Sequence, residues 1–187
     1  MDNYFNYITS GFLKGKKLQI PPLLTTRSTK NRVKESFFDS LRDELRNRVF
    51  IEGFGGSGIM AASALSNGAM RAYAIEKDEK AFKILQKNFR NLDSRLIAIN
   101  GDFFQKIASI LEEDEEFIIY IDPPFDLRSG FCDIYERVNK FIASLKDKRA
   151  VFIVIEHSSK VEFSETIGEF RLKKSKRFGR TTLSYYE

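Results

Sequence analysis

Apolar and polar residues follow two periods along the chain, and these periods predict alternating strands and helices. Five short apolar runs have the length and composition of buried strands: they span residues 49–51, 72–75, 96–99, 117–121 and 150–155. Between them, apolar residues recur every three or four positions, as on one face of a helix, in residues 59–67, 79–91, 103–111 and 130–145. This order predicts the α/β class, with a mostly parallel sheet covered by helices on both faces.

Both ends of the chain add elements to this pattern. Residues 29–45 carry apolar residues at intervals of four and predict an amphipathic helix. Residues 170–186 alternate around the breaker Phe178-Gly179, which predicts a hairpin at the sheet edge and brings the sheet to seven strands. We interpret residues 1–28, which contain Pro21-Pro22 and few aliphatic residues, as an N-terminal extension of a single domain over residues 29–187.

Composition restricts the class of protein. A chain of 187 residues with 42% hydrophobic content is sufficient for one domain with a full core. Its apolar runs of about five residues are far shorter than the roughly 20 that span a bilayer, and its first residues lack the layout of a signal peptide. One Cys and one His allow neither an internal disulfide nor a zinc cluster. We therefore expect a cytoplasmic monomer with no metal and no membrane contact.

Charge is distributed unevenly along the chain. The net charge is +5, but residues 1–34 and 171–182 together carry +12, so the remainder carries −7. Clustered cations of this kind are typical of a surface that binds a polyanion such as RNA, although a solvated face is an alternative. The candidate RNA-binding residues are Lys14, Lys16, Lys17, Arg27, Lys30, Arg32, Lys173, Lys174 and Arg180.

A second candidate site follows the predicted strand 117–121. Asp122, Pro123, Pro124 and Phe125 combine a carboxylate, two residues without an N–H and an aromatic ring. The carboxylate and the carbonyl oxygens can accept both hydrogens of an exocyclic nucleobase amine, while the ring of Phe125 stacks on the base, a contact worth roughly 1–3 kcal/mol. The alternative is a proline turn that only ends the strand.

A glycine-rich loop follows the first strand of the series. The segment Glu52-Gly53-Phe54-Gly55-Gly56-Ser57-Gly58 matches the G-x-G-x-x-G pattern, and Glu76 ends the next strand. Both a nicotinamide cofactor and S-adenosylmethionine would suit a glycine turn with an acidic residue on a ribose. Glu52 would repel a pyrophosphate but suit an ammonium group, and Asp102 adds a third carboxylate at a strand end, so S-adenosylmethionine is favoured. Taken singly, Glu76 and Asp102 could instead be helix caps.

These motifs together resemble the RsmD family of bacterial 16S rRNA guanine-N2 methyltransferases over nearly the whole chain. The resemblance rests on five ordered motifs, namely residues 15–18, residues 29–38, Gly55-Gly56-Ser57-Gly58, residues 64–69 with Glu76, and Asp122-Pro123-Pro124-Phe125. The family pattern has an aspartate and a bulkier apolar residue where this chain has Glu52-Gly53, and Arg-Pro-Thr where it has Arg27-Ser28-Thr29.

The resemblance implies a Rossmann-like class I methyltransferase that uses S-adenosyl-L-methionine and acts on rRNA or a small-subunit assembly particle. It implies catalytic roles for residues 122–125. It further implies cofactor contacts from Glu52, Gly53, Gly55, Gly56, Ser57, Gly58 and Glu76. We expect Lys77, Asp102 and Phe103, at the ends of the neighbouring strands, to complete the cofactor-binding set. The expected reaction is direct in-line transfer, in which Asp122 and a proline carbonyl orient the amine.

Two other functions fit the same residues. An amino-methyltransferase acting on adenine N6 or cytosine N4 would use the same acceptor groups, because they serve any exocyclic amine. A non-catalytic RNA-binding or ribosome-assembly factor could retain the fold without the activity. Redox chemistry with a nicotinamide cofactor is disfavoured, because the chain offers no second domain and no obvious proton donor.

Overall fold

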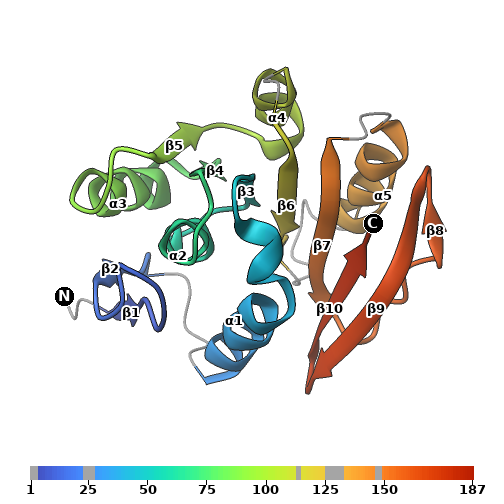
Figure 1. The fold of residues 1–187 in the computed structure, drawn as a ribbon. Coiled ribbons are helices and arrows are strands. Elements are labelled where there is room, and N and C mark those ends of the chain that lie inside the picture. The colour runs from blue at the N-terminus through green and yellow to red at the C-terminus, as the bar shows by residue number, and fades with distance from the viewer. Residues whose placement is uncertain (1–3, 23–27, 113–114, 125–132, 146–148) are drawn as a thin grey trace.

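The computed structural model describes residues 4–22, 28–112, 115–124, 133–145 and 149–187. Its main sheet has eight strands in the order β5-β4-β3-β6-β7-β10-β9-β8 within these residues (Figure 1). The first five strands of that order are parallel and the last three are antiparallel. The strands are β3 (Val49–Gly53), β4 (Arg71–Glu76), β5 (Leu96–Asn100), β6 (Phe117–Ile121), β7 (Ala150–Ser158), β8 (Thr166–Ile167), β9 (Phe170–Phe178) and β10 (Thr181–Tyr186).

Helices cover both faces of this sheet, as the sequence predicts (Figure 1). One face packs against α1 (Ser28–Leu41), α2 (Ile59–Ser66) and α3 (Glu79–Arg90). The other face packs against α4 (Phe103–Leu111) and α5 (Ile134–Ser144). Strands β3 and β6, in the middle of the parallel part, are buried along their whole length, which is why they are short continuous apolar runs rather than alternating ones. The predicted α/β class is therefore correct.

Three details of the prediction change. The helix expected over 29–45 ends at Leu41, and a separate 3₁₀ turn, η1 (Asp43–Leu45), follows and buries Leu45. The helix expected over 130–145 begins at Ile134 in the described residues. The predicted hairpin is β9–β10, but the two-residue strand β8 pairs with β9 beyond it, so the sheet has eight strands instead of seven. Such a short strand has too few residues for a detectable period.

The N-terminal residues contain a small sheet that sequence periodicity did not predict. Strands β1 (Phe5–Tyr7) and β2 (Lys17–Gln19) pair antiparallel and pack beside α2 and α3. Leu13 and Leu18 join the same buried cluster as α1, α2 and α3. At Gly11, where φ is +78°, an added Cβ would lie 1.8 Å from the Ser66 carbonyl oxygen, so the hairpin docks there only with glycine.

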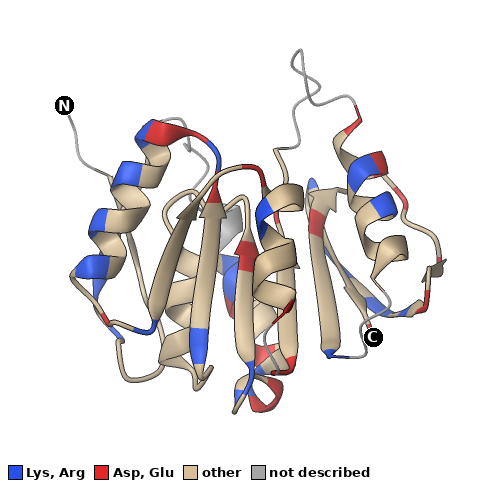
Figure 2. Cartoon of the chain, turned by 90° about the horizontal axis from the view of Figure 1, so that it is seen from above, with Lys and Arg blue, Asp and Glu red and all other residues tan. Residues whose placement is uncertain are grey.

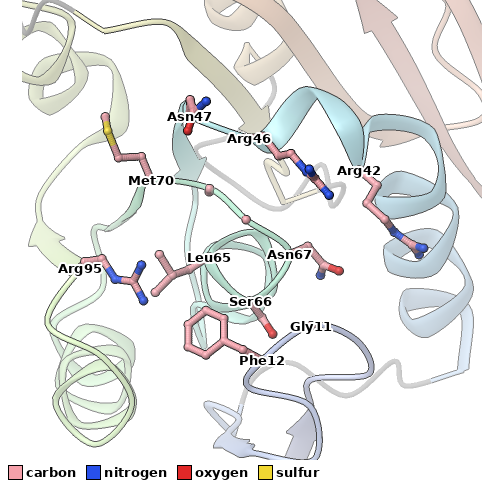
Figure 3. Close-up of a pocket in the computed structure, with 12 residues that line it drawn as sticks. Gly11, Phe12, Arg42, Arg46, Asn47, Leu65, Ser66, Asn67, Met70 and Arg95 are labelled. Atoms are coloured by element: carbon pink, nitrogen blue, oxygen red, sulfur yellow. The ribbon is translucent and has the colours of Figure 1, made fainter.

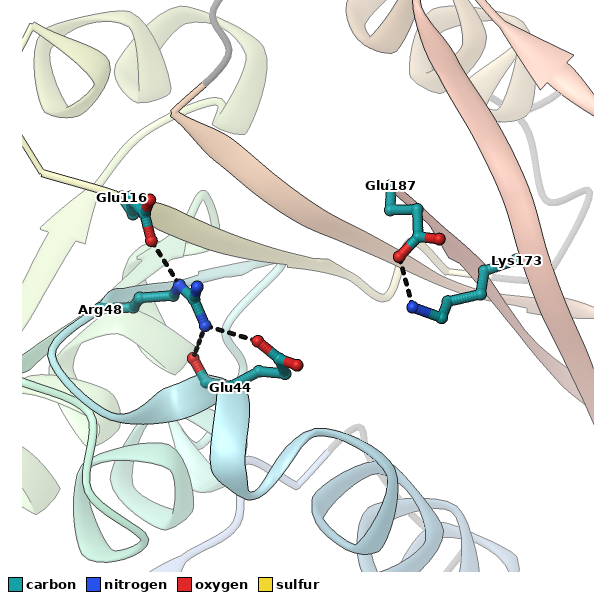
Figure 4. A network of polar contacts seen from close by, with 5 residues as sticks. All are labelled: Glu44, Arg48, Glu116, Lys173 and Glu187. Atoms are coloured by element: carbon teal, nitrogen blue, oxygen red, sulfur yellow. Dashed lines mark hydrogen bonds and ion pairs between the residues drawn. The ribbon is translucent and has the colours of Figure 1, made fainter.

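Ion pairs connect elements at the amino edge of the sheet. Arg48, just before β3, donates to the carboxylates of Glu44 at 2.6 Å and Glu116 at 2.7 Å, and Lys173 of β9 contacts Glu187 at 2.5 Å (Figure 4). These pairs are partly exposed, and such pairs contribute about 0–1 kcal/mol each. No helix in the described ranges is both long and apolar enough to traverse a lipid bilayer.

The only histidine of the chain is buried in β7. His157 Nδ1 lies 3.0 Å from the Ser158 carbonyl oxygen, which can only accept, so Nδ1 carries the proton in the neutral ring. Nε2 lies 2.9 Å from the Ser184 hydroxyl, which then donates to it. Burial lowers the pKa of His157 below its ordinary value of 6.5, despite opposing backbone contacts with Ser158 and Val161.

This burial predicts a loss of stability in mild acid. The unfolded chain takes up a proton near pH 6.5, whereas the folded state resists it, so the free energy of unfolding should fall as pH drops through about 6.5. The native imidazole C2–H resonance, which is single because the chain has one histidine, should titrate with a midpoint below 6.5. Replacement of His157→Gln should remove this contribution to the pH dependence, measured by urea unfolding at about pH 5 and about pH 7. A native midpoint at or above 6.5 would contradict the assignment.

Candidate functional site

The candidate residues for chemistry meet at the carboxyl edge of the parallel strands. In the sheet, Gly53 of β3 lies opposite Ile75 of β4 on one side and Ile121 of β6 on the other. Glu76 and Asp122, each one residue further, therefore flank the start of the glycine loop. Asn100 of β5 lies opposite Glu76, so Asp102 follows at the same edge. This is the place where open α/β sheets bind their ligands.

The glycine loop adopts a backbone that side chains rarely allow. Phe54, Gly56 and Gly58 have φ values of +63°, +54° and +76°. An added Cβ at Gly58 would lie 2.4 Å from the side chains of Leu85 and Phe89, so only glycine lets the loop approach α3. A non-glycine residue in the left-handed region is strained, and such strain is concentrated at functional sites.

Glu76 supports this loop with both of its carboxylate oxygens. Oε2 accepts from the backbone N–H of Gly56 at 2.8 Å, and Oε1 accepts from that of Asp78 at 2.7 Å. The alternative interpretation of Glu76 was a helix cap. The residue that caps α3 is instead Asp78, whose Oδ1 accepts from the Ala81 N–H at 2.8 Å. Glu76 is half-buried at the loop, and each oxygen has a second lone pair that could accept from a ribose hydroxyl.

Two polar residues of the glycine loop, Glu52 and Ser57, are buried. The Glu52 carboxylate is 4% exposed and accepts from the backbone N–H of Ala61 in the first turn of α2 at 2.8 Å. A carboxylate at this position stabilises the helix N-terminus. The carbonyl of Ser57 accepts from Asn88 Nδ2 at 2.9 Å, and the same amide exchanges hydrogen bonds with the backbone of Gln19. Asn88, which the sequence did not single out, thus connects the glycine loop, α3 and β2.

Asp102 begins α4 and also forms ion pairs. Its Oδ1 accepts from Phe104 N–H at 3.1 Å, so the capping alternative is correct for this residue. Lys77 Nζ lies 3.3 Å from Oδ2, and Arg137 of α5 lies 3.3 Å from Oδ1. Partial burial acts to raise the pKa of Asp102, but the Lys77 hydrogen bond and the Arg137 charge outweigh it and hold the pKa below its ordinary value.

Aromatic rings form the wall between the loop and α4. Phe103 is buried against Phe54, Phe104 and Phe141 with ring centroids 5.2–5.6 Å apart. The Arg137 guanidinium lies 4.3 Å from the Phe104 ring centroid. An added Cβ at Gly53 would lie 2.8 Å from the Phe103 ring. This contact gives a physical reason for glycine where the family pattern has a bulkier residue.

The segment Asp122-Pro123-Pro124-Phe125, called the tetrad below, directly follows β6, the strand next to β3. Asp122 is half-buried, Pro123 is buried and Pro124 is exposed, while Phe125 lies outside the described residues. The Asp122 N–H lies 3.5 Å from the Gly53 carbonyl, so the β3–β6 ladder extends toward the site. The tetrad and the glycine loop therefore share one edge of the sheet.

A buried tyrosine lies among three carboxylates at this edge. Tyr120 donates its hydroxyl hydrogen to Glu156, and both side chains are buried. Burial raises the pKa of Tyr120 well above its ordinary value, and the charges of Glu156, Asp122 and Glu52 raise it further. Glu156 follows Ile155, the partner of Ile121, so it lies level with Asp122, two residues before β7 ends at Ser158. Sequence reasoning left Glu156 outside the site, because nothing in a single strand end distinguishes a site residue from a structural one.

The candidate RNA-binding residues lie on both sides of α1 (Figure 1). Lys14, Lys16 and Lys17 are exposed in the β1–β2 region, and Arg32 is exposed on α1. Arg27 and the side chain of Lys30 are outside the described part of the chain.

At the other end, Arg180 is exposed in the β9–β10 turn, and two of the predicted cations already have contacts. Lys173 pairs with Glu187, and Lys174 Nζ lies 4.8 Å from the centroid of the Tyr185 ring.

A separate pocket lies at the opposite, amino edge of the sheet. It encloses about 810 Å³, and Arg42, Arg46, Arg95, Phe12 and Met70 are among its lining residues (Figure 3). Met70 precedes β4 and Arg95 precedes β5, so this pocket contains none of the residues of the carboxyl edge.

Comparison with known proteins identifies the family. A family model described as "Conserved hypothetical protein 95" matches residues 6–187. Ribosomal RNA small subunit methyltransferase D of Buchnera aphidicola subsp. Acyrthosiphon pisum is 31% identical over 161 residues, covering 82% of this chain and 78% of the relative. The chain belongs to the RsmD-like family of rRNA methyltransferases.

Solved structures agree with this family at the level of the fold. The Escherichia coli protein yhhF superposes with a TM-score of 0.75 at 26% identity, covering 98% of this chain and 97% of yhhF. An RNA methyltransferase from Salinibacter ruber, solved in complex with S-adenosyl-L-homocysteine, has a TM-score of 0.61 at 13% identity, covering 87% of this RsmD-like chain and 92% of its own. The Rossmann-like methyltransferase fold inferred from the sequence is therefore correct.

The contact between Gly53 and Phe103 predicts a coupled pair of substitutions. Gly53→Ala should destabilise the protein by about 1–3 kcal/mol, because the new methyl group overlaps the Phe103 ring. Phe103→Leu should create room and restore part of that loss in the double variant. Urea unfolding of the wild type, both single variants and the double variant gives the coupling energy. Additive losses would show that the two residues do not compensate each other.

Proposed function

We propose that this protein transfers a methyl group from S-adenosyl-L-methionine to the exocyclic N2 amine of a guanine in 16S rRNA. The observation that supports this most is the shared carboxyl edge of β3 and β6, which bears the glycine loop on one strand and Asp122-Pro123-Pro124 on the next. A methyl donor held by the glycine loop and an amine held by Asp122-Pro123-Pro124 would therefore be neighbours. The family membership supports rRNA as the substrate class.

The residues of the loop fit S-adenosylmethionine better than a phosphate-bearing cofactor. The edge carries Glu52, Glu76 and Asp102, and carboxylates favour the sulfonium and ammonium groups and the ribose hydroxyls of this molecule. S-adenosylmethionine supplies an electrophilic methyl group when bound. Glu76 is the proposed ribose ligand and Gly55–Gly58 the proposed backbone surface. Because Glu52 already caps α2, its proposed contribution is the negative charge beneath the loop.

The proposed role of the tetrad is to hold and orient the target amine. The Asp122 carboxylate and a proline carbonyl accept the two amine hydrogens, so the nitrogen lone pair is directed toward the donor. As the nitrogen becomes positive, Asp122 with Glu156 and Glu52 nearby stabilises that charge, since the groups are already in place. Stacking of the base on Phe125 remains a prediction. No strong base is needed before transfer.

We also propose that the basic residues on both sides of α1 contact the RNA backbone. The exposed cations Lys14, Lys16, Arg32 and Arg180 are available for phosphate contacts, whereas the Nζ of Lys17 already lies 4.7 Å from the centroid of the Phe5 ring. Lys173 and Lys174 would contribute less, because Glu187 and the Tyr185 ring already engage them.

A product analysis tests the proposed reaction. The protein is incubated with labelled S-adenosylmethionine and small-subunit particles from cells that lack it, and the nucleosides are identified by mass spectrometry. We expect labelled N2-methylguanosine. Labelled N6-methyladenosine or N4-methylcytidine instead would assign the tetrad to another base, and binding of RNA without any transfer would indicate an assembly factor.

Asp122→Ala should separate transfer from cofactor binding. Loss of the carboxylate that orients the amine should lower kcat by about 10²–10³-fold, while the Kd for S-adenosylmethionine, measured by calorimetry, stays within about twofold because Asp122 lies outside the proposed cofactor loop.

Asp43→Ala is the matched control, since Asp43 is exposed in η1 at the other edge of the sheet, and it should leave both constants unchanged. A large loss of cofactor affinity in Asp122→Ala with an unchanged melting temperature would move Asp122 into the cofactor site.

A further inference from the structure

The outer face of α3 carries a continuous stripe of cations. Lys80, Lys83, Lys87 and Arg90 are separated by three, four and three residues, a spacing that aligns side chains on one face of a helix. All four are exposed, and the opposite face buries Leu85, Asn88 and Phe89. Figure 2 shows the stripe as a row of blue bands along this helix. We call these four residues the α3 stripe.

The side chains of the α3 stripe are not engaged in ion pairs within the described residues. None of its four side chains forms an ion pair or hydrogen bond with another described residue. Some exposed cations on other helices differ in this respect: Lys140 pairs with Glu136 at 2.5 Å, and Arg42 pairs with Asp39 at 3.0 Å. The stripe also stands out because the chain between the two basic ends is acidic overall.

Helix stability does not account for the whole stripe. Lys87 and Arg90 lie in the last turn, where cations complement the helix dipole. Lys80 lies in the first turn, where the dipole favours acidic residues and disfavours a lysine. Its position therefore needs another explanation, such as an external anion.

The composition of this face favours a polyanion over other partners. The exposed positions of α3 hold the stripe, Glu79 and Gln86, with no exposed apolar side chain. A membrane surface or a protein interface core would require apolar groups, whereas an RNA backbone requires only cations.

The helix that carries the stripe also adjoins the basic N-terminal region through its buried face. Asn88 of α3 exchanges hydrogen bonds with Gln19 in β2, which contains the exposed Lys17. From Lys80 to Arg90 the stripe extends about 15 Å along the helix axis. The length of the stripe and its proximity to β2 suit a stretch of RNA backbone that crosses both α3 and β2.

We propose that the α3 stripe is a second RNA-contacting surface, which binds the phosphate backbone of the substrate away from the methylated base. This inference rests on the proposed function for the identity of the RNA. It adds a surface outside both basic ends, on the helix that directly follows the proposed ribose ligand Glu76. Such contacts position the RNA without reading its sequence.

The test compares RNA binding by matched variants of the full-length protein. Lys83→Gln with Lys87→Gln removes two charges from the stripe, and Lys83→Arg with Lys87→Arg keeps them. Binding to a 16S rRNA fragment is measured over a series of salt concentrations. The Gln variant should bind about five- to tenfold more weakly at low salt, and its slope of log K against log salt should fall by about 1.5, since each phosphate contact contributes about 0.7–0.9. The Arg variant should resemble the wild type.

A comparison of two single variants tests whether the position of the lost charge on the molecule matters. Lys87→Gln should weaken binding, whereas Lys140→Gln on α5, across the sheet, should not, although each removes one charge. In methyl transfer, the double Gln variant should raise KM for RNA with unchanged kcat and unchanged Kd for S-adenosylmethionine.

An unchanged salt slope, or an equal loss in Lys140→Gln, would overturn the α3 proposal. A loss that occurs with particles but not with naked RNA would also overturn it, because the stripe would then bind an acidic protein. These binding results are independent of catalysis, so absence of methyl transfer by the wild type would refute only the proposed function.

Discussion

The parallel register of β4, β3 and β6 is the constraint on which the rest of the site depends. These three strands end within one residue of each other, so the residues that follow them emerge at one edge. The apolar runs 49–51, 72–75 and 117–121 contribute nothing to chemistry themselves, yet their burial on both faces fixes the alignment. A shift of one residue in any of these ladders would turn the side chains after it toward the other face of the sheet. Packing of the core therefore determines the position of every polar group discussed above.

Backbone polar groups of the glycine loop are satisfied by side chains from distant elements. Glu76 accepts from Gly56, Asn88 donates to the Ser57 carbonyl, and Glu52 accepts from α2 just beyond the loop. These contacts offset the strain at Phe54, whose φ is +63°. Asn88 also holds β2, so the N-terminal hairpin and the loop share one amide. A change in the docking of the N-terminal hairpin would therefore alter the glycine loop through Asn88.

The hydrophobic pattern was sufficient for the parallel strands and most helices, because a strand buried on both faces is a continuous apolar run and a helix buried on one face shows a helical period. It failed where the structure depends on tertiary contacts. Strand β8 has two residues and pairs only with β9 within the described residues, and the β1–β2 hairpin docks on α2 where Gly11 approaches Ser66 and the Ser66 hydroxyl donates to the Ser10 carbonyl. At the site, the glycine loop, Glu76 and Asp122 were recognisable as motifs. Arg137 and Glu156 were not, since they lie 35 and 36 residues from their partners Asp102 and Tyr120.

Charge shows most clearly what sequence alone leaves out. A count along the chain emphasised the two basic ends, and it correctly placed many exposed cations there. It could not show that Lys173 has Glu187 as a partner or that Lys176 donates to the hydroxyls of Ser36 and Ser40 on α1. The charge count also assigned the cations of α3 to a central region that is acidic overall, although these cations share one exposed face. What a cation can bind depends on whether the fold has already supplied an acceptor, so the free cations of this protein are defined by packing and not by their number.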